Sequence, residues 1–180
     1  MSPSFKFTKE NLDLYLNELA KELKLLKCTR KLEIIIVGGA SILLNYNFRP
    51  SSYDVDAYFV SDVLKQAINN VADKLNLPVG WLNKDFIRTP SFSPKIIQYS
   101  SFYKEFKNVL TVRTISSEYL VAMKLVSFRN YKDDITDIAN IISEDKTINL
   151  ENIKTAVVNL YGFYDYLDKE RQKFIEKLFN

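Results

Sequence analysis

A short apolar run that ends in two glycines restricts the fold of this chain more than any other feature. Residues 32–37, LEIIIV, are too few for a typical helix and rich in β-branched side chains, so they predict a buried strand. The adjoining Gly38 and Gly39 permit a sharp bend of the backbone. A short helix over residues 40–47 and a second strand over residues 52–60 are expected to follow. This order indicates a fold that mixes strands and helices.

The rest of the chain predicts two further strands and several helices. Residues 93–103 and 108–115 are the expected strands, joined as a hairpin through residues 104–108, so that the sheet has about four strands. Residues 81–94 form the longest irregular stretch and are expected to be a loop. Apolar residues at helical spacing predict helices over residues 8–27, 63–76, 116–130, 132–143, 150–162 and 164–179.

These elements predict an α+β fold in two parts. Residues 1–115 form a small mixed sheet with an N-terminal helix and flanking helices, and residues 116–180 form a C-terminal helical bundle. The chain contains no Pro/Gly/Ser-rich linker and no internal repeat. The helical part is therefore expected to pack on the sheet as one body.

Composition excludes several classes of chemistry. Cys28 is the only cysteine, so the chain forms no intramolecular disulfide and fits a reducing compartment. The absence of histidine removes the commonest zinc ligand and the usual general base. The formal net charge of +3 does not by itself require a nucleic-acid partner. No signal core or membrane-spanning run is found, so we expect a cytoplasmic protein with no membrane partner.

Two aspartates of the second expected strand, Asp54 and Asp56, are the first candidates for catalysis. Alternate residues of a strand share one face, so both carboxylates project together while Val55 and Ala57 point into the core. Two like charges are costly there unless a cation lies between them. We expect Mg²⁺ or Mn²⁺, because such an ion prefers oxygen ligands and leaves positions for water and substrate phosphates.

The two glycines complete this pattern on the neighbouring strand. Gly38 and Gly39 lie where a strand ends and a helix begins, so backbone N–H groups can approach a phosphate and the helix dipole favours its charge. Each motif also has a simpler explanation: Gly-Gly is often only a tight turn, and Asp-x-Asp is often strand-end polarity. Their combination in this order favours the functional interpretation.

The stretch IIIVGGASILLNYNFRPSSYDVDAYF resembles the first motif of the DNA polymerase β-like nucleotidyltransferase superfamily. The Gly-Gly-Ala sequence, Arg49 and the later EYLVAMKLVSFRNYKDDITDI are similar to the AbiEii/MenT-like branch of small bacterial nucleotidyltransferases. The resemblance covers residues 33–60 and 111–142 and implies a nucleotidyltransferase core that binds an NTP. It implies nucleotide contacts at Gly38, Gly39, Ser41, Arg49, Ser52 and Lys124.

Lys124 is the lone charge within YLVAMKLVSF, residues 119–128. Such a lysine either extends to the surface or projects into a polar cavity, and the resemblance implies a triphosphate contact. On the next expected helix, a solvated charged face is the simpler explanation of Asp133, Asp134 and Asp137, and the first two could also complement the helix dipole. Asp137 lies among isoleucines and matches the branch, so it is the third candidate catalytic residue. The residues expected on the core side of this helix are Ile135, Ile138, Ala139 and Ile142.

The sequence departs from the superfamily pattern at two places. Many members carry a third carboxylate on a later strand as a general base, whereas residues 108–115 contain none, so Asp137 would take that role. Gly39 replaces the usual serine, which leaves Ser41 as a hydroxyl for phosphate. Arg49 and Ser52 match branch positions, but either residue could simply satisfy the turn.

The resulting hypothesis is a metal-dependent nucleotidyltransferase that transfers an NMP from an NTP to RNA, such as a tRNA 3′ end, or to a protein. The resemblance also implies a toxin–antitoxin or phage-defence component with a cognate antitoxin as partner. The alternative is a catalytically silent nucleotidyltransferase fold that binds a nucleotide or a protein, which the missing third carboxylate favours. The sequence does not choose between the acceptors.

Overall fold

The computed structural model describes residues 5–129 and 133–180 and divides into two compact units. The first unit contains the described residues up to Asp85 together with Ser101–Thr114. The second contains Phe86–Ser100 and the described residues from Ile115 to Asn180. The segment Phe86–Ser100, which the sequence grouped with the sheet, therefore belongs with the C-terminal helices.

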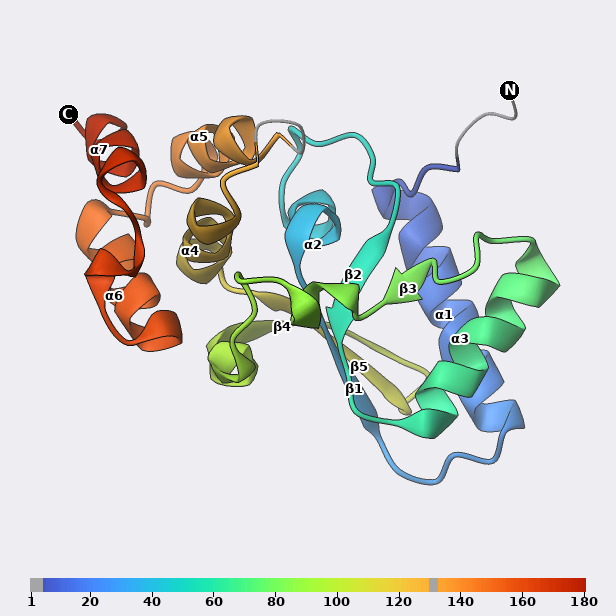
Figure 1. Ribbon diagram of the computed structural model, residues 1–180. Coiled ribbons are helices and arrows are strands. Elements are labelled where there is room, and N and C mark those ends of the chain that lie inside the picture. The colour runs from blue at the N-terminus through green and yellow to red at the C-terminus, as the bar shows by residue number, and fades with distance from the viewer. Residues whose placement is uncertain (1–4, 130–132) are drawn as a thin grey trace. The chain divides into compact units, whose positions relative to one another are not determined.

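Five strands form one mixed sheet in the order β3-β2-β1-β5-β4 (Figure 1). The central strand β1 pairs antiparallel with β2 and parallel with β5, and β2 pairs parallel with β3. This mixed sheet with flanking helices confirms the predicted α+β fold. The strands are β1 (Leu32–Ile36), β2 (Val55–Tyr58), β3 (Leu82–Asn83), β4 (Ser100–Phe106) and β5 (Leu110–Ile115).

The sheet has one strand more than the sequence predicted. Strand β3 lies within residues 81–94, which were expected to be a loop, so that expectation was wrong at this point. A strand of two residues is too short for the alternation that identifies strands in a sequence. It exists because its neighbour β2 supplies a partner, starting with the Val55 N–H that donates to the carbonyl of Trp81 at 2.9 Å.

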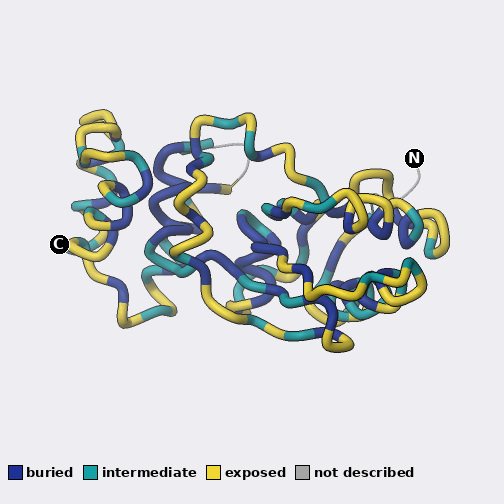
Figure 2. Tube along the Cα trace, turned by 90° about the horizontal axis from the view of Figure 1, so that it is seen from below, coloured by how far each residue is buried: buried dark blue, intermediate teal, exposed yellow. Residues whose placement is uncertain are grey.

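Three helices of the first unit are α1 (Lys9–Leu25), α2 (Gly38–Asn45) and α3 (Asp62–Leu75). Helix α1 begins after Thr8, whose hydroxyl accepts a hydrogen bond from the Asn11 N–H while the Asn11 side chain accepts from the Thr8 N–H. Helices α1 and α3 pack against each other (Figure 1), and buried residues of all three helices belong to the core cluster. Figure 2 shows buried and exposed positions alternating along the chain. No helix in the described ranges is both long and apolar enough to cross a membrane.

The strand register decides which residues face these helices. Ile36 lies opposite Ala57, and both belong to the core cluster with α1 and α3. Ile35 lies opposite Tyr58 and in register with Arg113 on the other face. Because side chains alternate along a strand, Asp56 belongs to that second face, away from α1 and α3.

Trp81 anchors the core at the beginning of β3. Its ring is 1 % exposed and stacks on Phe7 with centroids 5.9 Å apart, and its Nε1 donates to the carbonyl of Ile68 at 3.2 Å. Replacing Trp81 by Phe is expected to lower the free energy of unfolding by about 1–2 kcal/mol, because this hydrogen bond and part of the ring volume are lost. Urea unfolding followed by far-UV circular dichroism measures this. Replacement of the exposed Val79 by Ala is the control, and an equal effect of both would contradict the expectation.

The second unit is a helical bundle, as the sequence predicted. Helix α4 packs against both α5 and α6. The segment Pro94–Tyr99, expected as part of a strand, is instead a 3₁₀ helix, because Pro94 lacks the N–H that a strand needs and the Ser93 hydroxyl accepts the Lys95 N–H. The helices of the bundle are α4 (Ser117–Ser127), α5 (Asp134–Glu144), α6 (Leu150–Tyr161) and α7 (Lys169–Lys177).

Candidate active site

A bend at Gly38 connects β1 to α2. Gly38 has a φ of +61°, in the left-handed region that L side chains adopt only at a cost. The N–H of Val37 donates to the carbonyl of Asp56 at 2.9 Å, which ties the end of β1 to β2. The N-cap residue Val37 has no polar side-chain atom that could cap the first N–H groups of α2. These groups are donors suited to an anion.

Asp56 lies directly beside this bend. A Cβ atom added to Gly38 would lie 3.5 Å from Oδ2 of Asp56, so the carboxylate approaches the α-carbon of the glycine. Asp56 is half-buried within β2, whereas Asp54 is exposed and directly precedes the strand. The structure therefore places a carboxylate next to the N-terminus of α2, where the Asp-x-Asp motif predicted one.

Arg49 covers the second glycine. A Cβ atom on Gly39 would lie 3.0 Å from Nη2, 3.1 Å from Cζ and 3.2 Å from Nε of Arg49. The guanidinium is also held by the carbonyl of Ser51, which accepts from Nε at 3.3 Å. Arg49 thus occupies space that the usual serine side chain would need. One acidic group and one basic group flank the same bend.

The two predicted serine contacts lie in different settings. The hydroxyl of Ser52 donates to the carbonyl of Asp54 at 2.9 Å, and its backbone pairs with Phe7 through hydrogen bonds of 2.7 and 2.9 Å. Ser52 therefore holds the turn that precedes Asp54. Ser41 is fully buried in α2, and its hydroxyl has no hydrogen-bond partner among the residues that the structure describes.

Asn83 is a neighbour of Asp56 that sequence reasoning missed. The parallel pairing of β2 and β3 puts Asn83 in register with Asp56. Its Oδ1 accepts the Asp85 N–H at 2.9 Å and its Nδ2 donates to the carbonyl of Gly80 at 3.2 Å, so the side chain closes a turn. The Asn-Lys-Asp sequence is a turn signal that could have identified this residue.

Lys124 lies in the second unit, within a buried helix. Its side chain is 7 % exposed, and Nζ lies 2.8 Å from Oδ1 of Asp134 and 2.8 Å from Oδ2 of Asp137. The structure therefore brings Lys124 and Asp137 together, as a buried ion pair. Gly38, Gly39, Arg49 and Asp56 are brought together in the first unit.

Asp134 is fully buried, so its interpretation as part of a solvated face was wrong. Its Oδ2 accepts from the N–H of Arg129 at 2.9 Å and from Nε of Arg129 at 3.2 Å. Burial alone would raise the pKa of Asp134, but the charge of Lys124 and the hydrogen bonds from Lys124 and Arg129 outweigh it. The pKa therefore lies below its ordinary value of 3.8.

The buried face of α5 differs from the expected one. Of the four apolar residues expected in the core, Ile138 is buried, whereas the other three are only partly buried. The helix is rotated because its inner face must carry the two carboxylates that neutralise Lys124. The residues buried on α5 are Asp134, Asp137, Ile138 and Ile141.

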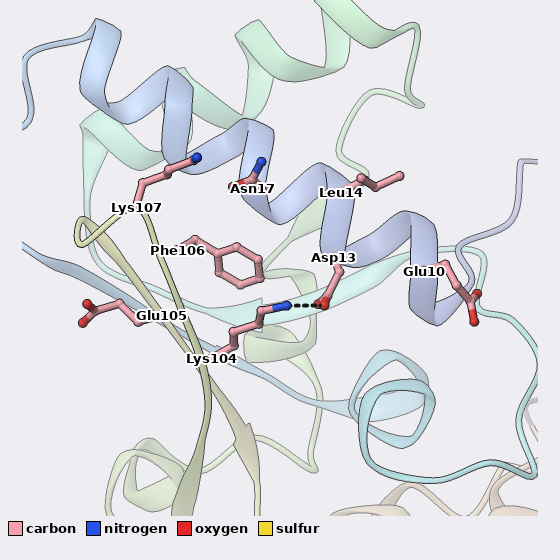
Figure 3. Close-up of a pocket in the computed structure, with 8 residues that line it drawn as sticks. All are labelled: Glu10, Asp13, Leu14, Asn17, Lys104, Glu105, Phe106 and Lys107. Carbon is pink, nitrogen blue, oxygen red and sulfur yellow. Dashed lines mark hydrogen bonds and ion pairs between the residues drawn. The ribbon is translucent and has the colours of Figure 1, made fainter.

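A separate cavity of about 360 Å³ lies between α1 and β4 in the first unit (Figure 3). Asp13 crosses it and accepts from Lys104 Nζ at 2.7 Å and from the Tyr103 hydroxyl at 3.0 Å. Leu14 and Phe106 contribute apolar surface. None of the predicted site residues lines this cavity, so it is distinct from the Gly38 bend.

A mixed sheet whose first strand ends in a Gly-Gly bend, with an Asp-x-Asp motif entering the adjacent strand, defines a nucleotidyltransferase-like fold. Residues 15–177 match the family model described as "Nucleotidyltransferase of unknown function (DUF6036)", and the chain belongs to this family. The narrower AbiEii/MenT-like branch stays a prediction.

Two other comparisons complete the findings. No curated protein matches the chain. Among solved structures, the chain is similar to the "Crystal structure of an antigenic nucleotidyltransferase-like protein from Paracoccidioides brasiliensis", with 18% sequence identity and a TM-score of 0.48. That match covers 97% of this chain and 94% of the other.

Proposed function

We propose that this protein is a metal-dependent nucleotidyltransferase that transfers an NMP from an NTP to an acceptor. The observation that carries the proposal is the position of Asp56 beside Gly38 and of Arg49 beside Gly39, at the N-terminus of α2. An anion there meets backbone N–H donors and a guanidinium, while a carboxylate lies within reach of a cation. This combination suits a nucleotide bound together with a metal ion.

The donor set suits Mg²⁺ or Mn²⁺, which also takes water and phosphate ligands, better than an ion whose ligands all come from the protein. Asp54 and Asp56 are two hard oxygen donors, and the described residues contain no cluster of three or more acidic or cysteine side chains that could hold a metal. Mg²⁺ commonly uses one or two carboxylates and completes its shell with water and phosphate oxygens. When bound, the ion would neutralise charge that develops on the α-phosphate and on the departing pyrophosphate.

The chain's own residues take the remaining roles in this proposal. The α2 N–H groups and Arg49 bind phosphate oxygens, and Ser52 holds the turn beside them. An acceptor hydroxyl attacks the α-phosphorus, so that a P–O bond forms and the bond to pyrophosphate breaks. Asp137 orients that hydroxyl or accepts its proton. β5 carries no carboxylate that could serve instead.

The acceptor decides the biological role, and one assay addresses it. The protein is incubated with each α-labelled NTP, Mg²⁺ and either total RNA or a cell lysate. Label in RNA would support a tRNA-type acceptor, and label in protein would support nucleotide modification of a partner. A toxin–antitoxin or phage-defence role would be supported if a small protein encoded next to this one suppressed the labelling. If label entered neither RNA nor protein, the enzymatic proposal would be contradicted.

A catalytically silent binding module is the second candidate, and the lack of a carboxylate on β5 favours it. Isothermal titration of NTPs with and without Mg²⁺ separates the two. Metal-independent binding that survives the Asp54→Asn substitution, in a protein that transfers no label, would support the module.

Arg49 provides the sharpest test of the phosphate site. Arg49→Met is expected to raise the NTP dissociation constant about 10- to 100-fold, because one charge-assisted contact worth about 1.5–3 kcal/mol is lost. Gly39→Ala should act in the same direction but less strongly, because the guanidinium must move away from the new methyl group. Titration with a non-hydrolysable NTP and Mg²⁺ measures both.

The control for this test is Arg30→Met, which removes an exposed arginine of the same unit. Thermal unfolding of each variant shows whether it is folded. If Arg49→Met and Arg30→Met bind the nucleotide equally well, Arg49 is not a phosphate ligand.

A further inference from the structure

The ammonium group of Lys124 is already engaged by two carboxylates. Its contacts with Asp134 and Asp137 are both 2.8 Å long, so two of its three N–H donors are used. Helix α4 buries every residue from Tyr119 to Val126, which leaves the lysine little freedom to extend elsewhere. Lys124 is therefore held in place by its surroundings.

Asp134 is the residue that holds it. One oxygen of Asp134 accepts from Lys124, and the other accepts twice from Arg129, so three donors surround a carboxylate with no exposed surface. Asp134 is also the first residue of α5, so these bonds join the end of α4 to the start of α5. A substrate has no access to this side chain.

Charge balance opposes a direct role of Lys124 toward a nucleotide. Lys124 and Arg129 carry two positive charges, and Asp134 and Asp137 carry two negative charges, so the cluster is neutral. A triphosphate that approached Lys124 would meet the two carboxylates that lie 2.8 Å from the same ammonium. A lysine that binds phosphate needs donors that no other group holds, whereas two of the three donors of Lys124 already face carboxylates.

We infer that Lys124 is a positioning residue that fixes the carboxylate of Asp137, that Asp134 anchors Lys124 for this purpose, and that Lys124 is not a triphosphate ligand. This inference rests on the proposed function, in which Asp137 acts on the acceptor, and it replaces the nucleotide contact that the family resemblance implies for Lys124. Nucleotide affinity and transfer rate should therefore respond differently when Lys124 is lost.

The test uses a charge-balanced double variant of the full chain, Lys124→Met with Asp134→Asn. Removing one positive and one negative charge together keeps the net charge of the cluster at zero, and thermal unfolding shows whether the variant folds. Its affinity for a non-hydrolysable NTP with Mg²⁺ is measured by titration, and its transfer rate is measured with α-labelled NTP. Arg49→Met serves as the reference for loss of a phosphate ligand, and Lys124→Arg tests rescue.

The expected result is a dissociation constant within about twofold of the wild type and a transfer rate at least about tenfold lower. Lys124→Arg should recover part of the rate, because its guanidinium can still donate to Asp137. A tenfold weaker affinity, as expected for Arg49→Met, would overturn the inference and restore the triphosphate role. An unchanged transfer rate would overturn it as well, because Lys124 would then be purely structural.

Failure of the proposed function is recognised separately, since the wild type would then transfer no label, whether or not it binds NTP. The pairing is still tested in that case by unfolding Lys124→Met, Asp137→Asn and the variant that combines them. The fold-change in the unfolding equilibrium constant of the double variant should be smaller than the product of the fold-changes of the two single variants, by a factor of about five or more. Independent effects would overturn the inference whether or not the protein is an enzyme.

Discussion

Asp56→Asn is expected to lower nucleotidyl transfer by about 100- to 1,000-fold, comparable to the loss of a principal electrostatic group in an active site. Asparagine keeps the size of aspartate but removes the charge that would hold a divalent ion beside Gly38. Folding is expected to be retained, because asparagine also keeps a side-chain oxygen that accepts hydrogen bonds. Transfer of α-labelled NTP to the acceptor measures the first effect, and thermal unfolding measures the second.

The matched control is Asp73→Asn, which removes an exposed carboxylate from α3 of the same unit. Its transfer rate should equal that of the wild type. Asp54→Asn should fall in the same range as Asp56→Asn, since both side chains are proposed to share one ion. If Asp56→Asn retained wild-type transfer at every Mg²⁺ concentration, Asp56 would not be a metal ligand and the enzymatic proposal would fail.

Local patterns were sufficient to predict the parts of the candidate site that lie close in sequence. The β-branched run identified β1, and the glycine pair identified the bend into α2, because both depend on preferences of the residues themselves. The alternation around Asp56 identified β2. These two strands pair in the structure, so Asp56 of the Asp-x-Asp motif lies beside Gly38.

Features that depend on distant partners escaped prediction. The two-residue strand β3 exists because β2 lies next to it, and only that pairing puts Asn83 in register with Asp56. The position of the Arg49 guanidinium over Gly39 likewise follows from how the turn folds back on α2. No propensity or periodicity contains this information.

Helix α5 shows why the spacing of apolar residues predicted the wrong buried face. A pattern of apolar residues favoured one face, but a buried lysine on α4 requires negative charge, and this requirement decides which face of α5 turns inward. Positions 134, 137, 138 and 141 follow the same helical spacing as a core stripe. Two aspartates at the start of such a stripe, with a lysine inside the preceding apolar helix, are the signal that could have revealed the cluster.

Asp134→Ala is expected to lower the free energy of unfolding by about 3–5 kcal/mol at pH 7, the largest stability effect among these substitutions. Removal of this carboxylate leaves Lys124 and Arg129 with the single negative charge of Asp137. It also deprives three donors of their acceptor, two of them from Arg129. Urea unfolding followed by far-UV circular dichroism measures the loss.

The same effect should depend on pH in a defined direction. The pKa of Asp134 in the folded protein is lowered from 3.8, so its stabilising contribution is present above that value and is lost as the pH falls through the folded-state pKa. The difference between wild type and Asp134→Ala should therefore be full at pH 6–7 and shrink below about pH 4. Glu144→Ala removes an exposed carboxylate from the same helix and should cost little at any pH. Equal losses for the two variants at pH 7, or a loss for Asp134→Ala that persists unchanged in acid, would show that the buried charge pairing does not stabilise the fold.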